Sequence, residues 1–251
     1  MKKVLITAPV HQSEDIFKEY LWSLNRLIIP EDVEVKRFFY LHNCEELKEF
    51  LNEDEYLILN DSSFFQVTEK THMWKNENFS AVAKMRTMAL EKARVENFDY
   101  IFSVDSDVLL NPMALKLLIN DNKDIVGNIY WTDFDGRGLL LPNCYDYENC
   151  QFNSQKGGVD RLKIMGVYNV GVVGACTLIG KRVIQNPYIN YFPIENISST
   201  KWEDQAFITR ARCLIPDINV CIDTRFPARH LYRKSEYELW MKDKEEYYGK
   251  Q

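Results

Sequence analysis

Two aspartates separated by one residue are the first feature of this sequence that could do chemistry. Asp105, Ser106 and Asp107 follow the short apolar run Tyr100–Val104, which is typical of a buried strand. Paired carboxylates supply the hard oxygen ligands that Mg²⁺ and Mn²⁺ prefer, and a metal held there can bind a diphosphate. The same spacing recurs in the glycine-flanked residues 133–135. The pattern alone therefore also fits a polar turn, and the preceding strand is what favours a metal site.

A second acidic pair, Glu203 and Asp204, stands at the start of the predicted helix Trp202–Arg212. Glu203 fits a capping box with Thr200 as the cap. Asp204 has apolar residues three, four and seven positions later, so it shares the inward face of the helix. An inward carboxylate in a first turn either compensates the helix dipole or acts as a general base that deprotonates an acceptor.

A histidine, His230, follows the last predicted strand. A single histidine is more often a packed or solvated residue, but neutral imidazole is also a common metal ligand. The residues alone leave both interpretations open.

The elements that must position these residues alternate between strands and helices. The expected strands are Val4–Ala8, Val33–Leu41, Tyr56–Leu59, Tyr100–Val104, Ile125–Tyr130, Val172–Ile179 and Val220–Ile222. The expected helices are Asp15–Leu27, Glu45–Leu51, Ser80–Val95, Asn111–Ile119, Trp202–Arg212 and Ser235–Gln251. This alternation predicts an α/β fold with a Rossmann-like, mostly parallel central sheet flanked by helices. Ligands in such folds bind beyond the carboxyl ends of the strands.

The composition is that of a globular protein, with 251 residues, 46% hydrophobic and 27% charged, and a formal net charge of −6. Because binding to a phosphate backbone requires a dense basic surface, the sequence disfavours a nucleic acid partner. The six cysteines include no C-x-x-C pair, and no run reaches the roughly 18 apolar residues that span a bilayer. The N-terminal stretch does not fit a secretion signal. We therefore expect free thiols and a cytoplasmic location.

Four motifs together resemble the family-two glycosyltransferases, which are metal-dependent, nucleotide-sugar enzymes of the GT-A fold. The stretches Gly174–Ile184, Trp202–Arg212 and Val220–His230 resemble the second half of that family. Upstream, residues 83–107 are similar to the helix and strand that end in the family's D-x-D motif. The resemblance covers residues 80–232, with the motifs in the expected order.

The resemblance implies a role for each residue that matches a motif. Asp107 would bind Mn²⁺ or Mg²⁺ directly, Asp105 would contact the ribose or the metal ion, and His230 would complete the metal or diphosphate site. Asp204 would be the catalytic base of an inverting enzyme, and Glu203 would orient the site. Further substrate- or nucleotide-binding residues implied by the resemblance are Thr7, Ala8, Pro9, Arg86, Trp202 and Arg210.

A single glycosyltransferase domain, residues 1–251, is the implied organisation. It divides into a nucleotide-sugar-binding half (1–110), an acceptor-binding half (111–234) and a C-terminal helix (235–251). The implied reaction moves a sugar from a nucleoside diphosphate donor, with UDP favoured, to an acceptor hydroxyl. Glycans, lipids, proteins, small molecules and modified nucleobases are all acceptors within the family, so the acceptor stays open.

Two departures from the family pattern bear on the donor. The residues Phe38–Asn43 replace the usual Asp-Asp-Gly-Ser after the second strand, which removes the usual carboxylate to the nucleobase, and Gly180 replaces a usually basic residue. Two alternative functions remain open. One is a nucleotidyltransferase of related fold, although Pro9–Ser13 lacks the glycine of a phosphate loop. The other is a catalytically inactive, sugar-binding relative.

Overall fold

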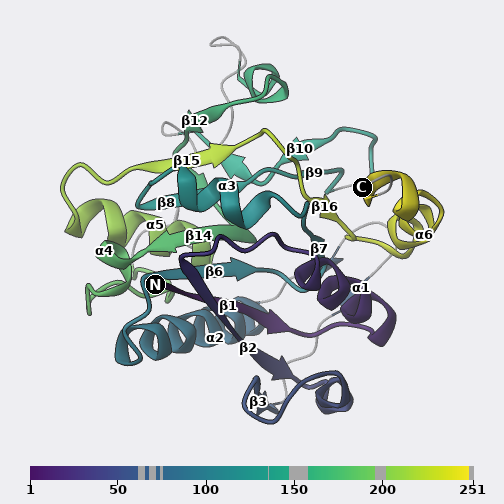
Figure 1. Ribbon diagram of the computed structural model, residues 1–251, viewed down its shortest axis with the longest axis horizontal. Helices are drawn as coiled ribbons and strands as arrows, with labels where there is room; N and C mark the ends of the chain where they lie inside the picture. The colour runs from purple at the N-terminus through teal and green to yellow at the C-terminus, as the bar shows by residue number, and fades with distance from the viewer. Residues whose placement is uncertain are drawn as a thin grey trace.

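One eight-stranded sheet organises the protein (Figure 1). The computed structural model describes all residues except 62–65, 68–71, 74–75, 135, 147–157, 196–201 and 249–251. The strand order is β12-β15-β8-β14-β6-β1-β2-β3. These strands are β1 (Lys2–Val10), β2 (Val33–His42), β3 (Tyr56–Leu59), β6 (Tyr100–Val104), β8 (Ile125–Asn128), β12 (Val167–Asn169), β14 (Cys176–Gly180) and β15 (Val220–Asp223). Only β12 and β14 run antiparallel to the other six, so the prediction of a mostly parallel sheet is confirmed.

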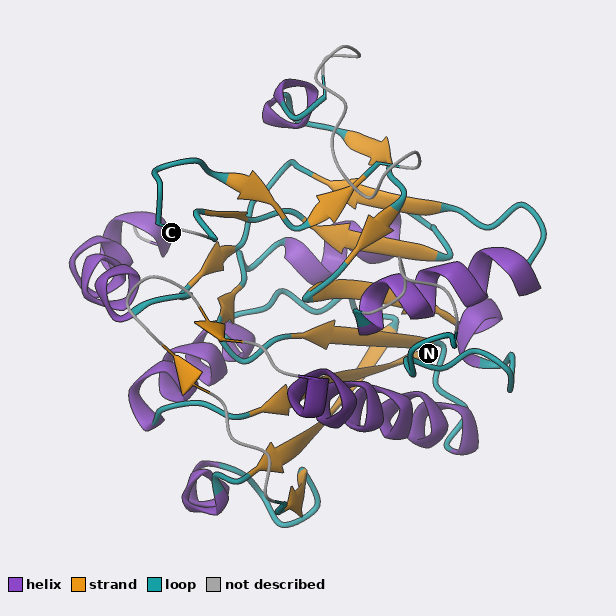
Figure 2. Cartoon of the chain, turned by 180° about the vertical axis from the view of Figure 1, so that it is seen from behind, coloured by secondary structure: helices purple, strands orange, loops and turns teal. Residues whose placement is uncertain are grey.

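Helices cover both faces of the sheet. The helices are α1 (Glu14–Asn25), α2 (Asn76–Val95), α3 (Ala114–Asn120), α4 (Lys181–Ile184), α5 (Glu203–Leu214) and α6 (Lys234–Tyr248), with 3₁₀ turns η1 (Glu45–Phe50) and η3 (Asp160–Lys163). Side chains alternate along β1, because successive residues of a strand point to opposite faces. Val4 and Ile6 pack in the core formed with α1, α3 and α6, whereas Leu5 packs in the core formed with α2, α4 and α5. Figure 2 shows the second layer from behind, with α2 and α5 lying across the sheet.

Two-stranded ladders extend the framework beyond the main sheet. They are β4 (Gln66–Val67) with β5 (His72–Met73), β7 (Val108–Leu109) with β16 (Arg229–His230), β9 (Trp131–Thr132) with β10 (Leu141–Pro142), and β11 (Cys144–Tyr145) with β13 (Val172–Val173). The ladder of β7 and β16 matters most for function, because it joins the segment after β6 to the last strand of the chain.

Local structure differs from the sequence prediction in several elements. The predicted strand Val172–Ile179 is broken into β13 and β14 by Gly174 and Ala175, and Ala175 has φ 63°. The helix predicted from Asn111 begins at Ala114, after a turn. Helix α5 begins at Glu203 with Trp202 as its N-cap, so the predicted capping box with Thr200 as the cap is wrong.

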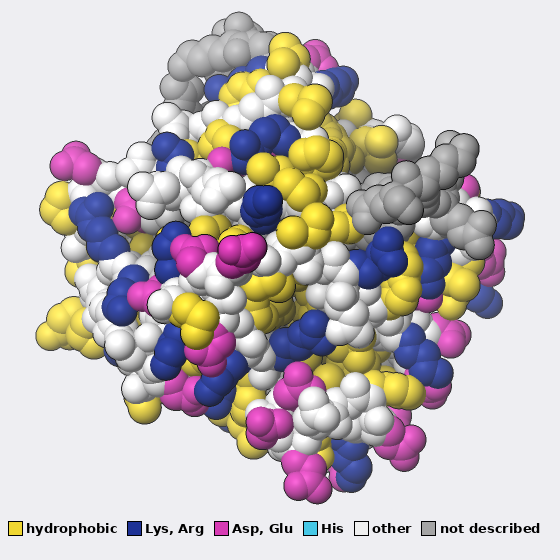
Figure 3. Space-filling model, viewed as in Figure 1, with side chains coloured by type: hydrophobic (Ala, Val, Ile, Leu, Met, Phe, Trp, Pro, Cys, Tyr) yellow, Lys and Arg dark blue, Asp and Glu magenta, His cyan; other side chains and the backbone are white. Residues whose placement is uncertain are grey.

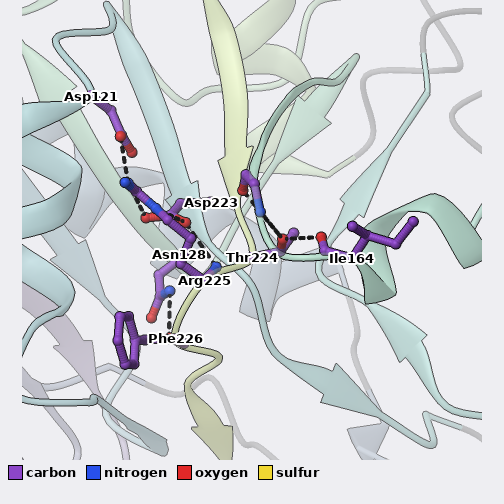
Figure 4. A network of polar contacts seen from close by, with 8 residues as sticks. Asp121, Asn128, Ile164, Asp223, Thr224, Arg225 and Phe226 are labelled. Atoms are coloured by element: carbon purple, nitrogen blue, oxygen red, sulfur yellow. Dashed lines mark hydrogen bonds and ion pairs between the residues drawn. The ribbon is translucent and has the colours of Figure 1, made fainter.

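An ion-pair network fixes the chain between β15 and β16 (Figure 4). The Arg225 guanidinium lies 2.8 Å from Asp223 and 2.5 Å from Asp121. The hydroxyl of Thr224 donates to the carbonyl of Ile164, at 2.7 Å. These contacts anchor the end of β15, from which the chain continues to β16 and His230.

The C-terminal helix packs onto the first helix. Trp240 has no exposed surface, and its indole N–H donates to Glu19 at 2.8 Å. Lys244 forms an ion pair with the same carboxylate, and the ring of Trp22 lies edge-on to Trp240. Helix α6 is therefore an integral part of one core layer.

Charges of both signs are interspersed over the face drawn in Figure 3. Among the described helices, none combines the length and apolar character needed to cross a membrane. The five cysteines in the described ranges are free thiols. A cytoplasmic location and the division into two halves stay predictions.

Candidate active site

A cleft of about 860 Å³ opens at the carboxyl ends of β1 and β6. Segments distant in the sequence line it, among them residues 9–13 at the end of β1, residues 82–86 of α2, residues 105–107 after β6, residues 203–204 at the start of α5, and residues 231–234 after β16. This is the edge at which open α/β sheets bind ligands. The volume lies within the range of roughly 300–1,000 Å³ that is usual for small-molecule and cofactor sites.

The pairing of β16 with β7 brings His230 to the D-x-D motif. His230 lies opposite Val108, and its Nε2 is 3.4 Å from Oδ2 of Asp107. The other ring nitrogen, Nδ1, is 2.7 Å from the hydroxyl of Thr132. The imidazole also packs against the ring of Tyr130, with 4.5 Å between centroids. Neighbours on both sides thus fix the orientation of the imidazole toward Asp107.

A single guanidinium joins the two acidic pairs. Arg86, on α2, is only 5% exposed. Its Nη1 lies 2.7 Å from Oδ1 of Asp204, and its Nη2 lies 2.8 Å from Oδ1 of Asp105. Glu203 is 3.8 Å away, and the ring of Tyr191 lies under the guanidinium at 5.7 Å. The structure therefore brings the D-x-D motif and the Glu-Asp pair to one place, as the sequence predicts.

Burial changes the acidity of these carboxyl groups. It raises the pKa of Asp105 to about 7, against the opposing effect of Arg86. It also raises the pKa of Glu203 to about 7, and the neighbouring charge of Asp204 adds to that rise. Burial raises the pKa of Asp204 as well, and Arg86 counteracts it. Asp204 therefore combines a raised proton affinity with a cationic partner that favours its ionised form.

We expect the metal-free protein to lose stability as the pH rises from about 4.5 to about 7. Carboxyl groups with a raised pKa bind protons in the folded state that the unfolded chain has already released, so their stabilising effect is present at low pH and lost across this range. Urea denaturation between pH 5 and 8 measures how steeply the free energy of unfolding falls with pH. Glu203→Gln should make this slope shallower. The exposed Glu53→Gln serves as the control. Identical slopes for Glu203→Gln and the unsubstituted chain would contradict this assignment.

The turn between β13 and β14 contacts both the side chain of Asp204 and the backbone of Asp105. A Cβ atom on Gly174 would lie 2.0 Å from Oδ2 of Asp204, so the carboxylate packs directly against the glycine. The next residue, Ala175, accepts a hydrogen bond from the backbone N–H of Asp105 at 2.7 Å. The side chain of Asn143 donates to the Gly174 carbonyl at 3.0 Å. One turn therefore sets the position of the D-x-D backbone and of the Asp204 side chain.

We expect Gly174→Ala to lower the free energy of unfolding by about 1–3 kcal/mol, the usual cost of overpacking. In an Asp204→Ala background the cost should almost vanish, because the added methyl group would lie 3.5 Å from the remaining Cβ of residue 204, an ordinary contact. Urea denaturation of the two single variants and the double variant gives this coupling energy. Gly180→Ala, whose added Cβ meets only ordinary contacts, is the matched control. Additive effects of the two substitutions would contradict the contact.

The predicted site residues fall into two groups in the structure. The cleft is lined by Pro9, Arg86, Asp105, Asp107, Glu203 and Asp204. The other predicted residues lie outside the cleft lining. His230 contacts Asp107 without lining the cleft. Thr7 and Ala8 are buried in β1. Trp202 packs against Tyr145. Arg210 donates to the carbonyls of Asn190, Phe192 and Pro193, so it stabilises the backbone of residues 190–193.

Several residues of the site were not predicted from the sequence. Asn143 and Tyr191 contact the central residues only through the tertiary fold, and no sequence pattern marks them. Lys234 and Tyr237 line the cleft because the chain turns back over it after β16. Six of the ten glycines, Gly174 among them, lie between residues 157 and 180, but the spacing does not indicate which of them packs against an acidic side chain.

A mostly parallel sheet with a D-x-D motif after a central strand and a Glu-Asp pair beside it defines the class of GT-A-like glycosyltransferases. Comparison with known proteins identifies the group within this class. The chain belongs to glycosyltransferase family 25, because the N-terminal domain of that family matches residues 31–226. The GT-A-like class implied by the family-two resemblance is thereby confirmed, and family 25 is the family that matches.

Three curated relatives illustrate the similarity. Procollagen galactosyltransferase 1-A of Xenopus laevis is 31% identical over 212 residues, which are 76% of this chain and 33% of the relative. Procollagen galactosyltransferase 2 of Mus musculus is 34% identical over 131 residues, 48% of this chain and 19% of the relative. Procollagen-lysine,2-oxoglutarate 5-dioxygenase 2 of Homo sapiens is 25% identical over 210 residues, 80% of this chain and 25% of the relative. The chain spans between a fifth and a third of the length of these relatives.

Two solved structures have a similar chain trace. S. aureus TarS, residues 1–349, is 18% identical, with a TM-score of 0.48, covering 89% of this chain and 60% of that chain. The inositol-1-phosphate CTP transferase from T. maritima is 15% identical, with a TM-score of 0.49, covering 98% of this chain and 97% of that chain.

Proposed function

We propose that this chain transfers a sugar from a nucleoside diphosphate donor to an acceptor hydroxyl, with a divalent metal ion and with Asp204 as the general base. The observation that carries the proposal is the bridge formed by Arg86 between Asp105 and Asp204. It supports a single centre in which a donor-binding carboxylate pair and a base act on the same substrate. Membership of family 25 supports the same reaction class.

The donor fits the part of the cleft beside β1 and β6. Residues 9–13 and the D-x-D motif line this part, in the position where open α/β sheets bind nucleotides. We propose UDP as the nucleotide and a hexose as the sugar. The names of the relatives specify galactose for those proteins, so UDP-galactose is the first donor to test.

The metal would be held by Asp107 and His230, with Asp105 beside them. Carboxylate oxygens and one imidazole nitrogen form a donor set that suits Mn²⁺ or Mg²⁺. Bound to a metal through Nε2, His230 would donate its Nδ1–H to the hydroxyl of Thr132, 2.7 Å away, which is the kind of support that metal-binding histidines have. Among the described residues, no three such side chains stand in a preassembled metal-binding cluster. When bound, the ion would stabilise the negative charge of the departing diphosphate as a Lewis acid.

Asp204 would take the proton from the acceptor hydroxyl as its oxygen attacks the anomeric carbon. A bond forms between that oxygen and carbon, the bond from the carbon to the diphosphate breaks, and the electron pair leaves with the diphosphate. The side chain of Asp204 is 23% exposed, so an acceptor can reach it. Attack from the side opposite the diphosphate inverts the anomeric centre. Glu203 and Arg86 would hold the carboxylate in position for the transfer.

The proposal is tested by incubating the chain with UDP- and GDP-sugars and Mn²⁺ and measuring released nucleoside diphosphate and the melting temperature. We expect release and a raised melting temperature with a UDP-sugar, because a ligand that binds the folded state stabilises it by mass action. Both effects should be lost with a chelator and in Asp107→Asn. A response to CTP or UTP alone would instead support a nucleotidyltransferase, and binding without release would support an inactive, sugar-binding protein.

A further inference from the structure

Two aromatic side chains, Tyr145 and Trp202, form a pair that the proposed reaction does not yet use. Their ring centroids are 6.4 Å apart, and the ring planes are tilted by 33°. Trp202 is 45% exposed, although it directly precedes the buried Glu203. Large apolar side chains at a surface are informative when they gather beside a functional group, and here that group is the Glu-Asp pair at the start of α5.

Two short segments of the chain connect the aromatic pair to Asp204. Tyr145 is on β11, where it pairs with Val172 of β13. Strand β13 leads directly into Gly174, which packs against Oδ2 of Asp204. Trp202 approaches the same carboxylate along the chain, as the N-cap of α5. Asp204, which lines the donor cleft, is thus linked to Tyr145 through β13 and Gly174 and to Trp202 through the first turn of α5.

We infer that the aromatic pair is the acceptor platform and that the acceptor presents a sugar ring there. This inference rests on the proposed function and specifies its acceptor. One face of a pyranose carries C–H groups, whose positive ends are attracted to the negative face of an aromatic ring. A sugar stacked on the rings would turn its edge hydroxyls outward, and one of them would be presented to Asp204. A short-chain hydroxyl, as in a peptide side chain or glycerol, has no such flat apolar face to place on the rings.

Stacking against fixed rings also suits the chemistry. The reaction needs one chosen hydroxyl held close to both the base and the anomeric carbon, and holding reactants in this way lowers the barrier substantially. Tyrosine and tryptophan lose little conformational freedom when they bind, because each has only two side-chain torsions. The platform would therefore determine which hydroxyl reaches Asp204.

Binding of simple probes tests the platform without knowledge of the donor. Saturation-transfer NMR on the full chain would compare methyl β-D-galactopyranoside and methyl β-D-glucopyranoside with glycerol. We expect saturation on the C–H protons of at least one glycoside and none on glycerol. Trp202→Ala should weaken glycoside binding about tenfold, Trp202→Phe should retain most of it, and Tyr188→Ala should match the unsubstituted chain. Tyr188 is the matched control because it is an aromatic residue with 73% exposure outside the cleft and the pair.

A second measurement separates this inference from the proposed function. With the donor that the nucleotide-sugar panel identifies, the ratio of sugar transferred to glycoside over donor hydrolysed should fall about tenfold in Trp202→Ala. Unchanged glycoside binding in Trp202→Ala, equal saturation of glycerol, or an equal loss of transfer and hydrolysis overturns the platform. Failure of the unsubstituted chain to cleave any donor overturns the proposed function, and the NMR comparison still decides whether the rings bind sugar.

Discussion

Asp204→Asn is expected to lower sugar transfer by about 10²–10⁴-fold, the usual contribution of a positioned general base. An amide cannot accept the proton of the attacking hydroxyl, so the bond to the anomeric carbon would have to form without assistance. The substitution preserves the shape of the side chain, and the amide oxygen can still accept from Arg86. Donor binding should therefore persist.

Transfer rates and donor affinity must be measured together for this variant. Calorimetric titration with the active nucleotide sugar gives the affinity, and product formation gives the rate. Asp160→Asn, which removes a carboxylate that is 83% exposed on η3, is the control and should leave both quantities unchanged. Near-normal turnover by Asp204→Asn would remove the base assignment, and loss of donor affinity would move the residue to the donor site.

Arg86→Met is expected to lower the free energy of unfolding by about 3–5 kcal/mol at pH 8, as is typical when one partner of a buried ion pair is removed. The guanidinium is almost fully buried and is shared by Asp105 and Asp204. Without it, carboxylates would stand close together in a desolvated site with no cation to offset their charge. This is the largest stability effect that we predict for a single substitution in the site.

The pH dependence of the Arg86→Met effect gives a specific signature. Arg86 lowers the pKa of Asp105, Glu203 and Asp204 against the effect of burial. Its removal should let these groups take up protons, so the loss of stability should be smaller at pH 5 than at pH 8. Lys163→Met, which breaks an exposed pair with Asp160, should cost about 0–1 kcal/mol. Urea denaturation at the two pH values decides the matter: equal losses at both would contradict the electrostatic account.

The sequence was sufficient to predict most of the fold because the strands are short apolar runs and the helices have clear apolar faces. Tyr100–Val104 and Tyr56–Leu59 are predicted at their observed bounds. The antiparallel insertion of β14 between β6 and β8 was not predictable from alternation alone, because alternation gives element types and not their order in the sheet. The break at Ala175 was also missed, since its left-handed conformation is one that a residue other than glycine rarely adopts.

The sequence predicts where a site residue lies when its motif directly follows a strand, but not when its position depends on tertiary contacts. Asp105 and Asp107 stand at a strand end, so their position at the ligand-binding edge follows from topology. Arg86 was expected near the nucleotide, but its link between Asp105 and Asp204 depends on how α2 and α5 pack on the sheet. Arg210 matched a family motif, yet its contacts are with backbone carbonyls outside the cleft.

The two-residue break between β13 and β14 would couple the two halves of the proposed reaction. Its glycine packs against Oδ2 of Asp204, which would accept the proton, and its alanine carbonyl accepts a hydrogen bond from the backbone N–H of Asp105, which would face the donor. A displacement of this turn would therefore move the proposed base and the proposed donor-binding motif together. Nucleophile activation and departure of the diphosphate would then stay synchronous without a separate relay between the two substrates.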